Sequence, residues 1–218
     1  MKACWPLMGV RSISDRWTVG KGAGALVLAL LCVLGIAAIQ QAGWLDRLNT
    51  GLMGAAGDVR DSAWGGPSIA LMRLATAIGD TIGRIAILAV VFSLLLWRGR
   101  RADARWLALM MAGGTALNLI LKQIFSAPRP DLLPHLDIVH SYSFPSGHAA
   151  GNMMLFGALA MLAGRPVFYW IAAIMTALIG VSRVWLGVHW PSDVMAGWIL
   201  GLGWLLLCRV WLPARRGQ

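Results

Sequence analysis

The chain contains several long apolar runs that carry almost no charge and are separated by short polar segments. The longest, Gly22–Leu45, has 24 residues without Asp, Glu, Lys or Arg. Of all residues 58% are hydrophobic and only 13% are charged, which is not the composition of a soluble domain. A membrane-spanning helix needs about 20 predominantly apolar residues, so we expect an all-α polytopic membrane protein with six transmembrane helices. The six runs are Gly22–Leu45, Thr81–Trp97, Trp106–Leu121, Ala149–Gly164, Pro166–Ser182 and Val194–Cys208.

The segment Asp46–Asp80 separates the first two runs. It contains three turn signals, at Asn49–Gly51, Gly57–Asp58 and Gly65–Pro67. Its last part, Ser68–Gly79, includes Arg73 and is too short for a span. We expect an interfacial or re-entrant helical segment here, between the first and second spans. Residues 1–218 then form a single membrane-embedded domain.

The basic residues are distributed unevenly between the two ends of these runs. Of the 19 Lys and Arg residues, 12 fall on the side of the N-terminus and seven on the other side. By the positive-inside rule, both termini lie in the cytoplasm and the opposite ends face a periplasm or the exterior. We therefore expect an integral protein of a cytoplasmic membrane. The net charge of +10 forms no basic face, so nucleic acid is not an expected partner.

Four polar segments interrupt the second half of the chain. A chain that alternates between the two faces of a membrane places all four on the same face. Three fixed cations, two imidazoles and a carboxylate would then share one pocket, which is suited to binding a phosphate group. The segments are Lys122–Pro130, Pro145–His148, Ser182–Arg183 and His189–Asp193.

The first polar segment combines a Lys at a helix end with an Arg on a stiff loop. Pro128 and Pro130 cannot continue a helix, so we expect the helix to end near Ser126. Lys122 and Arg129 could then approach one anion from two directions, although two cations facing lipid headgroups would give the same pattern.

The second polar segment has the residues that begin a helix. Ser146 suits the N-cap, and Gly147 lets the backbone approach a ligand closely. The free N–H groups of that helix start would form an anion site, with His148 in the first turn facing it. A capped helix start with an incidental His is the alternative.

The fourth polar segment contains the pair His189 and Asp193, four residues apart around Pro191. This spacing lets the carboxylate accept from Nδ1–H and leaves Nε2 free as a nucleophile. A metal pair is the competing interpretation, but no further ligands stand in matching positions, so we expect no metal and no cofactor. His135 and His140 are expected to be exposed in the outer loop, without a role.

Two other patterns receive structural interpretations. Cys4, Cys32 and Cys208 show neither disulfide nor zinc spacing and are expected to fill apolar space. Gly197 and Gly201 form a small-residue face on the last run. We expect that face to pack against a neighbouring helix of the same chain rather than against a second copy.

In order, the polar segments read Lys-x6-Arg-Pro, Pro-Ser-Gly-His and Ser-Arg-x5-His-x3-Asp. This arrangement resembles the type 2 phosphatidic acid phosphatase superfamily, in its bacterial integral-membrane branch. The resemblance covers the motif core, Lys122–Asp193, and no key position departs from the three motifs.

The resemblance implies a role for each motif residue. Phosphoryl oxygens would be bound by Lys122, Arg129, Arg183 and the backbone N–H groups of Ser146 and Gly147. His189, oriented by Asp193, would attack phosphorus and form a phosphohistidine, and His148 would protonate the leaving oxygen. With side chains supplying the cations, this chemistry needs no metal.

The function expected from these features is a metal-independent phosphatase that removes a terminal phosphate from a lipid phosphate or diphosphate at the outer face of the membrane. The candidate substrates are phosphatidate, phosphatidylglycerol phosphate, undecaprenyl diphosphate and phosphorylated lipid A. The alternatives are a phosphotransferase that passes the group to another lipid, and a non-catalytic lipid-phosphate binding or transport protein. Selectivity is expected to lie in Asp46–Asp80 and Asp131–Ser143, which carry no readable code, and the oligomeric state is left open.

Overall fold

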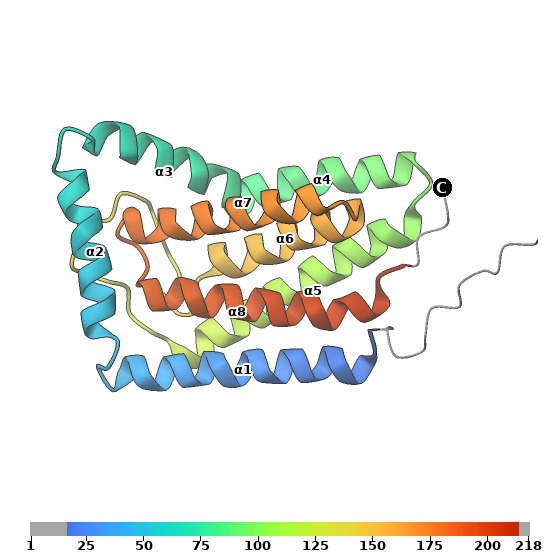
Figure 1. Ribbon diagram of the computed structural model, residues 1–218, viewed down its shortest axis with the longest axis horizontal. Coiled ribbons are helices and arrows are strands. Elements are labelled where there is room, and N and C mark those ends of the chain that lie inside the picture. The colour runs from blue at the N-terminus through green and yellow to red at the C-terminus, as the bar shows by residue number, and fades with distance from the viewer. Residues whose placement is uncertain (1–16, 214–218) are drawn as a thin grey trace, which may run out of the picture.

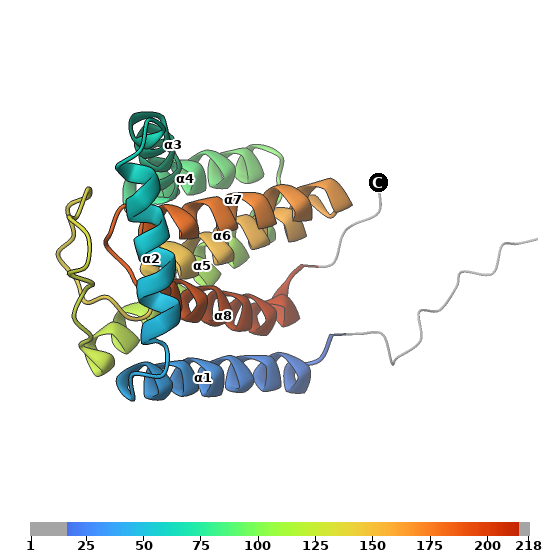
Figure 2. The ribbon, with the colours of Figure 1, turned by 60° about the vertical axis from the view of Figure 1, so that its left-hand side comes forward.

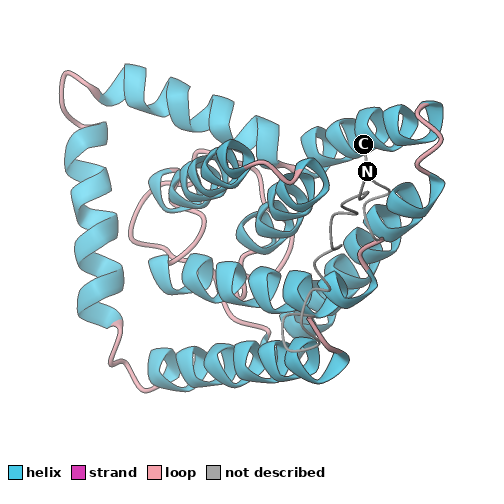
Figure 3. Cartoon of the chain, turned by 45° about the vertical axis from the view of Figure 1, so that its right-hand side comes forward, coloured by secondary structure: helices cyan, strands magenta, loops and turns pink. Residues whose placement is uncertain are grey.

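The computed structural model describes residues 17–213, which form eight α-helices and one short 3-10 helix without any β-strand (Figure 3). The prediction of an all-α protein is confirmed. The predictions about Cys4 and about the basic residues before Trp17 and after Pro213 lie outside the described residues. The helices are α1 (Val19–Gln41), α2 (Asp46–Arg60), α3 (Gly65–Gly79), α4 (Thr81–Trp97), α5 (Arg101–Phe125), α6 (Gly147–Ala163), α7 (Pro166–Trp185), α8 (Pro191–Cys208) and η2 (Arg209–Trp211).

Four helices are long and apolar enough to cross a membrane, namely α1, α5, α7 and α8 extended by η2. A fifth crossing results if α3 and α4, which meet at a 50° bend, count as one broken span. Helix α6 is apolar but has only 17 residues. At 1.5 Å per residue it is about 26 Å long, a little less than the roughly 30 Å hydrocarbon core. The chain is therefore an integral membrane protein with four or five candidate spans among its described residues, and the count of six stays a prediction.

The segment between the first two runs is helical where turns were predicted. Helix α2 covers both Asn49–Gly51 and Gly57–Asp58, so those two turn predictions are wrong. The residues serve tertiary contacts instead of turns. Asn49 is buried and its Oδ1 accepts a hydrogen bond from the Ser192 N–H at 3.2 Å, while Leu133 packs directly against Gly57. The third turn signal, Gly65–Pro67, lies in the first turn of α3, immediately after the turn that joins α2 to α3.

The long helices lie side by side, and α2 crosses one end of the bundle (Figure 1). Helix α6 packs against α5, α7 and α8 and also touches α3 and α4. Helices α5 and α7 end, and α6 and α8 begin, at the end that α2 crosses (Figure 1). The loop between α5 and α6 lies at this same end (Figure 2). The alternation inferred from the apolar runs thus brings all four polar segments to one end of the bundle.

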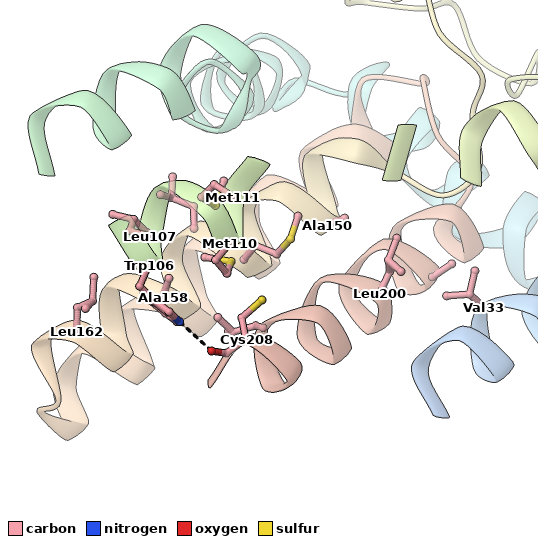
Figure 4. Close-up of a cluster of buried hydrophobic side chains, with 14 of the residues drawn as sticks. Val33, Trp106, Leu107, Met110, Met111, Ala150, Ala158, Leu162, Leu200 and Cys208 are labelled. Carbon is pink, nitrogen blue, oxygen red and sulfur yellow. Dashed lines mark hydrogen bonds between the residues drawn. The ribbon is translucent and has the colours of Figure 1, made fainter. Parts of the chain in front are cut away.

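Toward the other end, the helices enclose an apolar cluster built from α1, α4, α5, α6 and α8 (Figure 4). Trp106 is buried there, and its Nε1 donates a hydrogen bond to the Cys208 carbonyl at 2.8 Å. This bond satisfies the indole and one of the last carbonyls of α8 together. The described cysteines, Cys32 and Cys208, form no disulfide.

The small-residue face of α8 packs against α6, as expected for a contact within the chain. A Cβ atom at Gly197 would lie 2.6 Å from the Ser146 carbonyl oxygen, and one at Gly201 would lie 2.6 Å from the Ala150 carbonyl oxygen. Because these neighbours are backbone atoms, they cannot move aside without shifting a helix. The two glycines therefore set the close approach of α8 to the first turns of α6, and so position His148 relative to His189.

Replacing Gly201 by leucine is expected to push α8 away from α6 and to lower the free energy of unfolding by at least about 1–3 kcal/mol, the usual cost of overpacking. Gly24→Leu is the matched control, because no atom lies within 4 Å of a Cβ at that position on α1. The measurement is the thermal unfolding midpoint of each variant in the same detergent. A Gly201→Leu midpoint equal to that of the control would contradict the close packing.

Candidate active site

A cavity of about 430 Å³ lies at the end of the bundle that α2 crosses, enclosed by α4, α5, α6, α7 and the α5–α6 loop. Six of the eight site residues expected from the sequence line it. They are Lys122, Arg129, Gly147, His148, Arg183 and His189. The other two, Ser146 and Asp193, are fully buried and do not line the cavity. The structure thus brings residues from four distant segments to one place.

Lys122 occupies the last turn of α5. The helix ends at Phe125, and Ser126 adopts the left-handed conformation (φ 46°), which confirms the predicted helix end. Lys122 is 5% exposed, and its ammonium donates hydrogen bonds to the carbonyls of Tyr142 and Ser143. These bonds fix the ammonium at the cavity and also hold the chain that leads into α6.

Arg129 lies on the loop after α5 and faces His189. Its Nε donates to the Ser141 carbonyl at 2.9 Å, and one terminal nitrogen donates to the Val188 carbonyl at 2.6 Å. The same nitrogen is 3.4 Å from His189 Nε2. Burial, together with the charge of Arg183, lowers the pKa of Arg129 to about 10, so the guanidinium stays charged at neutral pH. Because a guanidinium can only donate, its contact with His189 requires an unprotonated Nε2.

Ser146 caps α6 as predicted, and its Oγ accepts from the Ala149 N–H at 3.5 Å. Its own N–H, however, donates to the Asp193 carbonyl at 3.0 Å. That N–H is therefore not available to a phosphate, and the expectation that it binds one is corrected. Ser146 instead joins the start of α6 to the start of α8, and the cavity-lining backbone at this helix start is that of Gly147.

His148 follows in the first turn of α6 and lines the cavity. Its Nε2 is buried and has no hydrogen-bond partner among the described residues. A buried ring nitrogen without a partner is costly. It therefore marks a position where a ligand atom can bind.

Arg183, on the last turn of α7, is 1% exposed. One terminal nitrogen donates to Thr76 Oγ1 and to Asp137 Oδ2, the latter at 2.6 Å. Its Nε has no partner in the described part of the chain. Asp137 belongs to the α5–α6 loop and is a site residue that sequence reasoning missed, since nothing in its local sequence distinguishes it from Asp131.

His189 and Asp193 form the predicted pair across the start of α8, with Nδ1 3.3 Å from Oδ2. The carboxylate is fully buried, and the same Oδ2 accepts from Ser143 Oγ at 2.5 Å and from the Trp190 N–H at 3.0 Å. Its Oδ1 lies 3.4 Å from the Gln40 amide nitrogen of α1. Sequence reasoning missed Ser143 and Gln40, since neither belongs to the motif spacing that identified the pair.

The imidazole of His189 is uncharged at neutral pH. Burial lowers its pKa from 6.5 to about 4, because desolvation outweighs the opposing effect of the Asp193 carboxylate. A neutral ring with Nδ1–H directed at Asp193 has its Nε2 lone pair free, and Arg129 faces that nitrogen. This is the protonation state that a nitrogen nucleophile requires.

The charges around the cavity favour an anion. Lys122, Arg129 and Arg183 are joined there by Arg84 of α4, whose terminal nitrogen donates to the Gly147 carbonyl at 3.0 Å. Within residues 17–213, no group of three or more His, Cys, Asp or Glu side chains could hold a metal ion. His135 and His140 are exposed in the α5–α6 loop, as expected, and His140 also lines the cavity.

The fold and this site define a helical membrane protein with a cationic, histidine-containing pocket at one end of the helix bundle. The sequence model of the PAP2 superfamily matches residues 103–217, more than half of the chain. The chain therefore belongs to the PAP2 superfamily.

Two matching relatives are a bacterial and an archaeal protein. Phosphatidylglycerophosphatase B of Bacillus subtilis is 29% identical over 138 residues, which are 58% of this chain and 66% of that protein. Undecaprenyl-diphosphatase of Sulfolobus acidocaldarius is 51% identical over 61 residues, 28% of this chain and 29% of that protein. Each match thus spans less than two thirds of the relative's length.

A similar fold is found in the crystal structure of a transmembrane PAP2 type phosphatidylglycerolphosphate phosphatase from Bacillus subtilis. The TM-score is 0.75 at 26% sequence identity, and the match covers 85% of this chain and 94% of that one. The membrane-protein fold described above is therefore shared with a solved member of the superfamily.

The pKa of His189 predicts a pH dependence of stability. Between pH 6.5 and about 4 the unfolded chain binds a proton at this ring and the folded chain does not, so acidification favours unfolding. The contribution, roughly 3 kcal/mol at most, is present above pH 6.5 and lost as pH falls to about 4. His189→Gln is expected to lose less thermal stability than the parent protein between about pH 7 and about pH 4.5.

His140→Gln, in the exposed loop, is the matched control and is expected to behave like the parent protein. Equal losses of thermal stability in the parent protein and in His189→Gln would contradict a buried, uncharged His189.

Proposed function

We propose that this protein is an integral-membrane, metal-independent phosphatase that removes a terminal phosphate from a lipid phosphate or diphosphate through a phosphohistidine intermediate. The observation that carries the proposal is the unprotonated Nε2 of His189, whose ring is held by Asp193 at Nδ1 and lines a cavity that also contains buried cations. The relatives are named as phosphatases of such lipids, which supports the same substrate class.

The phosphoryl group would bind among Lys122, Arg129 and Arg183, with the backbone of Gly147 at the start of α6. The substrate phosphate would displace the Asp137 carboxylate from Arg183, since both are anions that compete for one guanidinium. The fixed positive charges would stabilise the charge on the equatorial oxygens in the transition state.

In the first step, the Nε2 lone pair of His189 forms a bond to phosphorus as the bond from phosphorus to the lipid oxygen breaks. Protonated His148 gives its proton to that oxygen, and the lipid product leaves. In the second step, neutral His148 takes a proton from water, whose oxygen attacks phosphorus and breaks the P–N bond. Inorganic phosphate is released, and both histidines return to their starting states.

The proposed membrane placement has six spans, both termini in the cytoplasm and the cavity facing the periplasm or exterior. The second span is α4, and α4 and α6 are the shortest at 17 residues each. The distribution of basic residues supports this orientation. The bend between α3 and α4 and the position of α2 across the cavity end support an interfacial location for Asp46–Asp80. Residues 1–218 would then act as one domain.

The expected activity is phosphate release from at least one of phosphatidate, phosphatidylglycerol phosphate, undecaprenyl diphosphate and lipid A phosphate, in detergent with EDTA. His148→Ala should lower kcat by about 100- to 10,000-fold through loss of proton transfer. His189→Ala should abolish turnover, and His135→Ala, in the exposed loop, should not.

Activity that EDTA removes and a divalent metal restores would contradict the metal-free mechanism. Lipid consumption without free phosphate would indicate the transferase, and saturable binding without turnover would indicate the binding protein. The same assay on intact spheroplasts tests the orientation, because hydrolysis of an externally added short-chain substrate requires an outward-facing cavity.

A further inference from the structure

The cavity extends beyond the residues that would hold one phosphoryl group. Its volume of about 430 Å³ compares with roughly 30 Å³ for one water molecule in the liquid, so there is room for more than one phosphate group. His189 and Arg129 are in contact with each other on one side of it. Arg84 and Asn118 also line it, on the side of the first turn of α6.

Arg84 is bound to that first turn directly. Its terminal nitrogen donates to the Gly147 carbonyl at 3.0 Å, and the guanidinium lies over Gly151, where a Cβ would come within 2.4 Å of it. Among the described residues no carboxylate lies within 4 Å of Arg84. The acidic residue whose charge acts on Arg84 is Asp80. Its carboxylate already accepts a hydrogen bond from the Gly83 N–H at 2.6 Å and so caps α4. An arginine in an apolar helix without an ion-pair partner is costly and usually functional.

Asn118 supplies a second donor at the same place, and this donor has no partner within residues 17–213. It lies one turn before Lys122 on α5 and is 5% exposed, and its Nδ2 has no hydrogen-bond partner in the described chain. Its Oδ1 would be 3.1 Å from a Cβ on Gly147, which places the amide beside the start of α6. Arg84 and Asn118 therefore flank the helix turn that carries His148.

The chemistry of the proposed reaction identifies what these donors would meet. In an in-line displacement the leaving group departs opposite the nucleophile, and His148 is the group that protonates the leaving oxygen. The remainder of the leaving group must then lie on the side of the cavity that holds His148, Arg84 and Asn118. A neutral alcohol would leave the charge of Arg84 without a counter-ion, whereas an anionic phosphate would pair with that charge and accept from the Asn118 amide.

We propose that Arg84 and Asn118 form a second anion site that binds a phosphate within the leaving group. The site selects lipids that carry two phosphates over phosphate monoesters of neutral alcohols. The inference rests on the proposed phosphatase function and narrows its substrate class. The second phosphate can be bonded directly to the first, as in a polyprenyl diphosphate, or separated by glycerol, as in phosphatidylglycerol phosphate.

Two matched substrate pairs test this selectivity. Farnesyl diphosphate and farnesyl phosphate share a tail, as do phosphatidylglycerol phosphate and phosphatidate with the same acyl chains. For Arg84→Gln, we expect the ratio of kcat/KM between the members of a pair to fall by roughly 10- to 100-fold, the worth of a charge-assisted hydrogen bond. Arg84→Lys should keep part of the selectivity, and Asn118→Ala should lower the ratio by about 3- to 10-fold. The substrate pair whose kcat/KM ratio falls in Arg84→Gln shows which spacing between the two phosphates the site accepts.

Two further variants separate this role from a structural one. Gly151→Ala keeps every charge but displaces the Arg84 guanidinium, so it should lower the same ratio. Arg73→Gln removes an exposed arginine on α3, outside the cavity, and should leave the ratio unchanged. A ratio that stays constant in Arg84→Gln and Asn118→Ala, whether or not the rates fall, overturns the second site.

A binding measurement distinguishes failure of this inference from failure of the phosphatase function. The non-hydrolysable methylenediphosphonate should bind the parent protein at least about tenfold more tightly than methylphosphonate in calorimetry, and Arg84→Gln should remove the difference. If no lipid is hydrolysed but this difference is found, the proposed function fails and the anion site stands. Equal affinities in the parent protein overturn the site.

Discussion

The structure depends on the way its buried cations are held without being neutralised. Lys122 donates to backbone carbonyls, Arg129 to the carbonyls of Ser141 and Val188, and Arg84 to the Gly147 carbonyl. Neutral acceptors satisfy the N–H groups, yet they leave the positive charge available to an anion. Only Arg183 has a carboxylate partner within 4 Å among the described residues at the cavity, and that partner, Asp137, lies on a loop. The cavity is therefore suited to an anion such as the proposed phosphate, which would replace Asp137 of the α5–α6 loop at Arg183.

Hydrogen bonds to carbonyl groups also connect the helices and loops that carry the site residues. Lys122 holds the chain before α6, and the Ser146 N–H joins the start of α6 to the Asp193 carbonyl at the start of α8. Gly197 and Gly201 permit that close approach. Because each contact joins two segments that carry motif residues, a shift of one helix would move several parts of the site together.

Much of this arrangement can be read from the sequence because its signals are local. The prolines after Ser126 predict the end of α5, Ser146 predicts a helix start, and the spacing of His189 and Asp193 predicts their contact. Alternation of apolar runs predicts that the polar segments meet at one end of the bundle. The family motifs then supply roles for residues that this alternation has already placed together.

What the sequence does not reveal depends on partners from distant segments. Helix α2 forms across predicted turn residues because Asn49 and Gly57 have tertiary contacts with α8 and the long loop. The Ser146 N–H is unavailable because Asp193, far along the chain, accepts it. Ser143, Gln40, Asp137, Arg84 and Asn118 join the site through such contacts and belong to no recognised spacing.

In the proposed mechanism, His189 Nε2 becomes covalently bonded to phosphorus. The direct measurement is to incubate the protein with a lipid substrate labelled in its terminal phosphate, to quench at short times, and to test the protein for an acid-labile, base-stable phosphate. We expect the labelled phosphate on His189 of the parent protein and no label on His189→Ala. Turnover without any protein-bound label at times shorter than one catalytic cycle, or label that persists in His189→Ala, would contradict this mechanism.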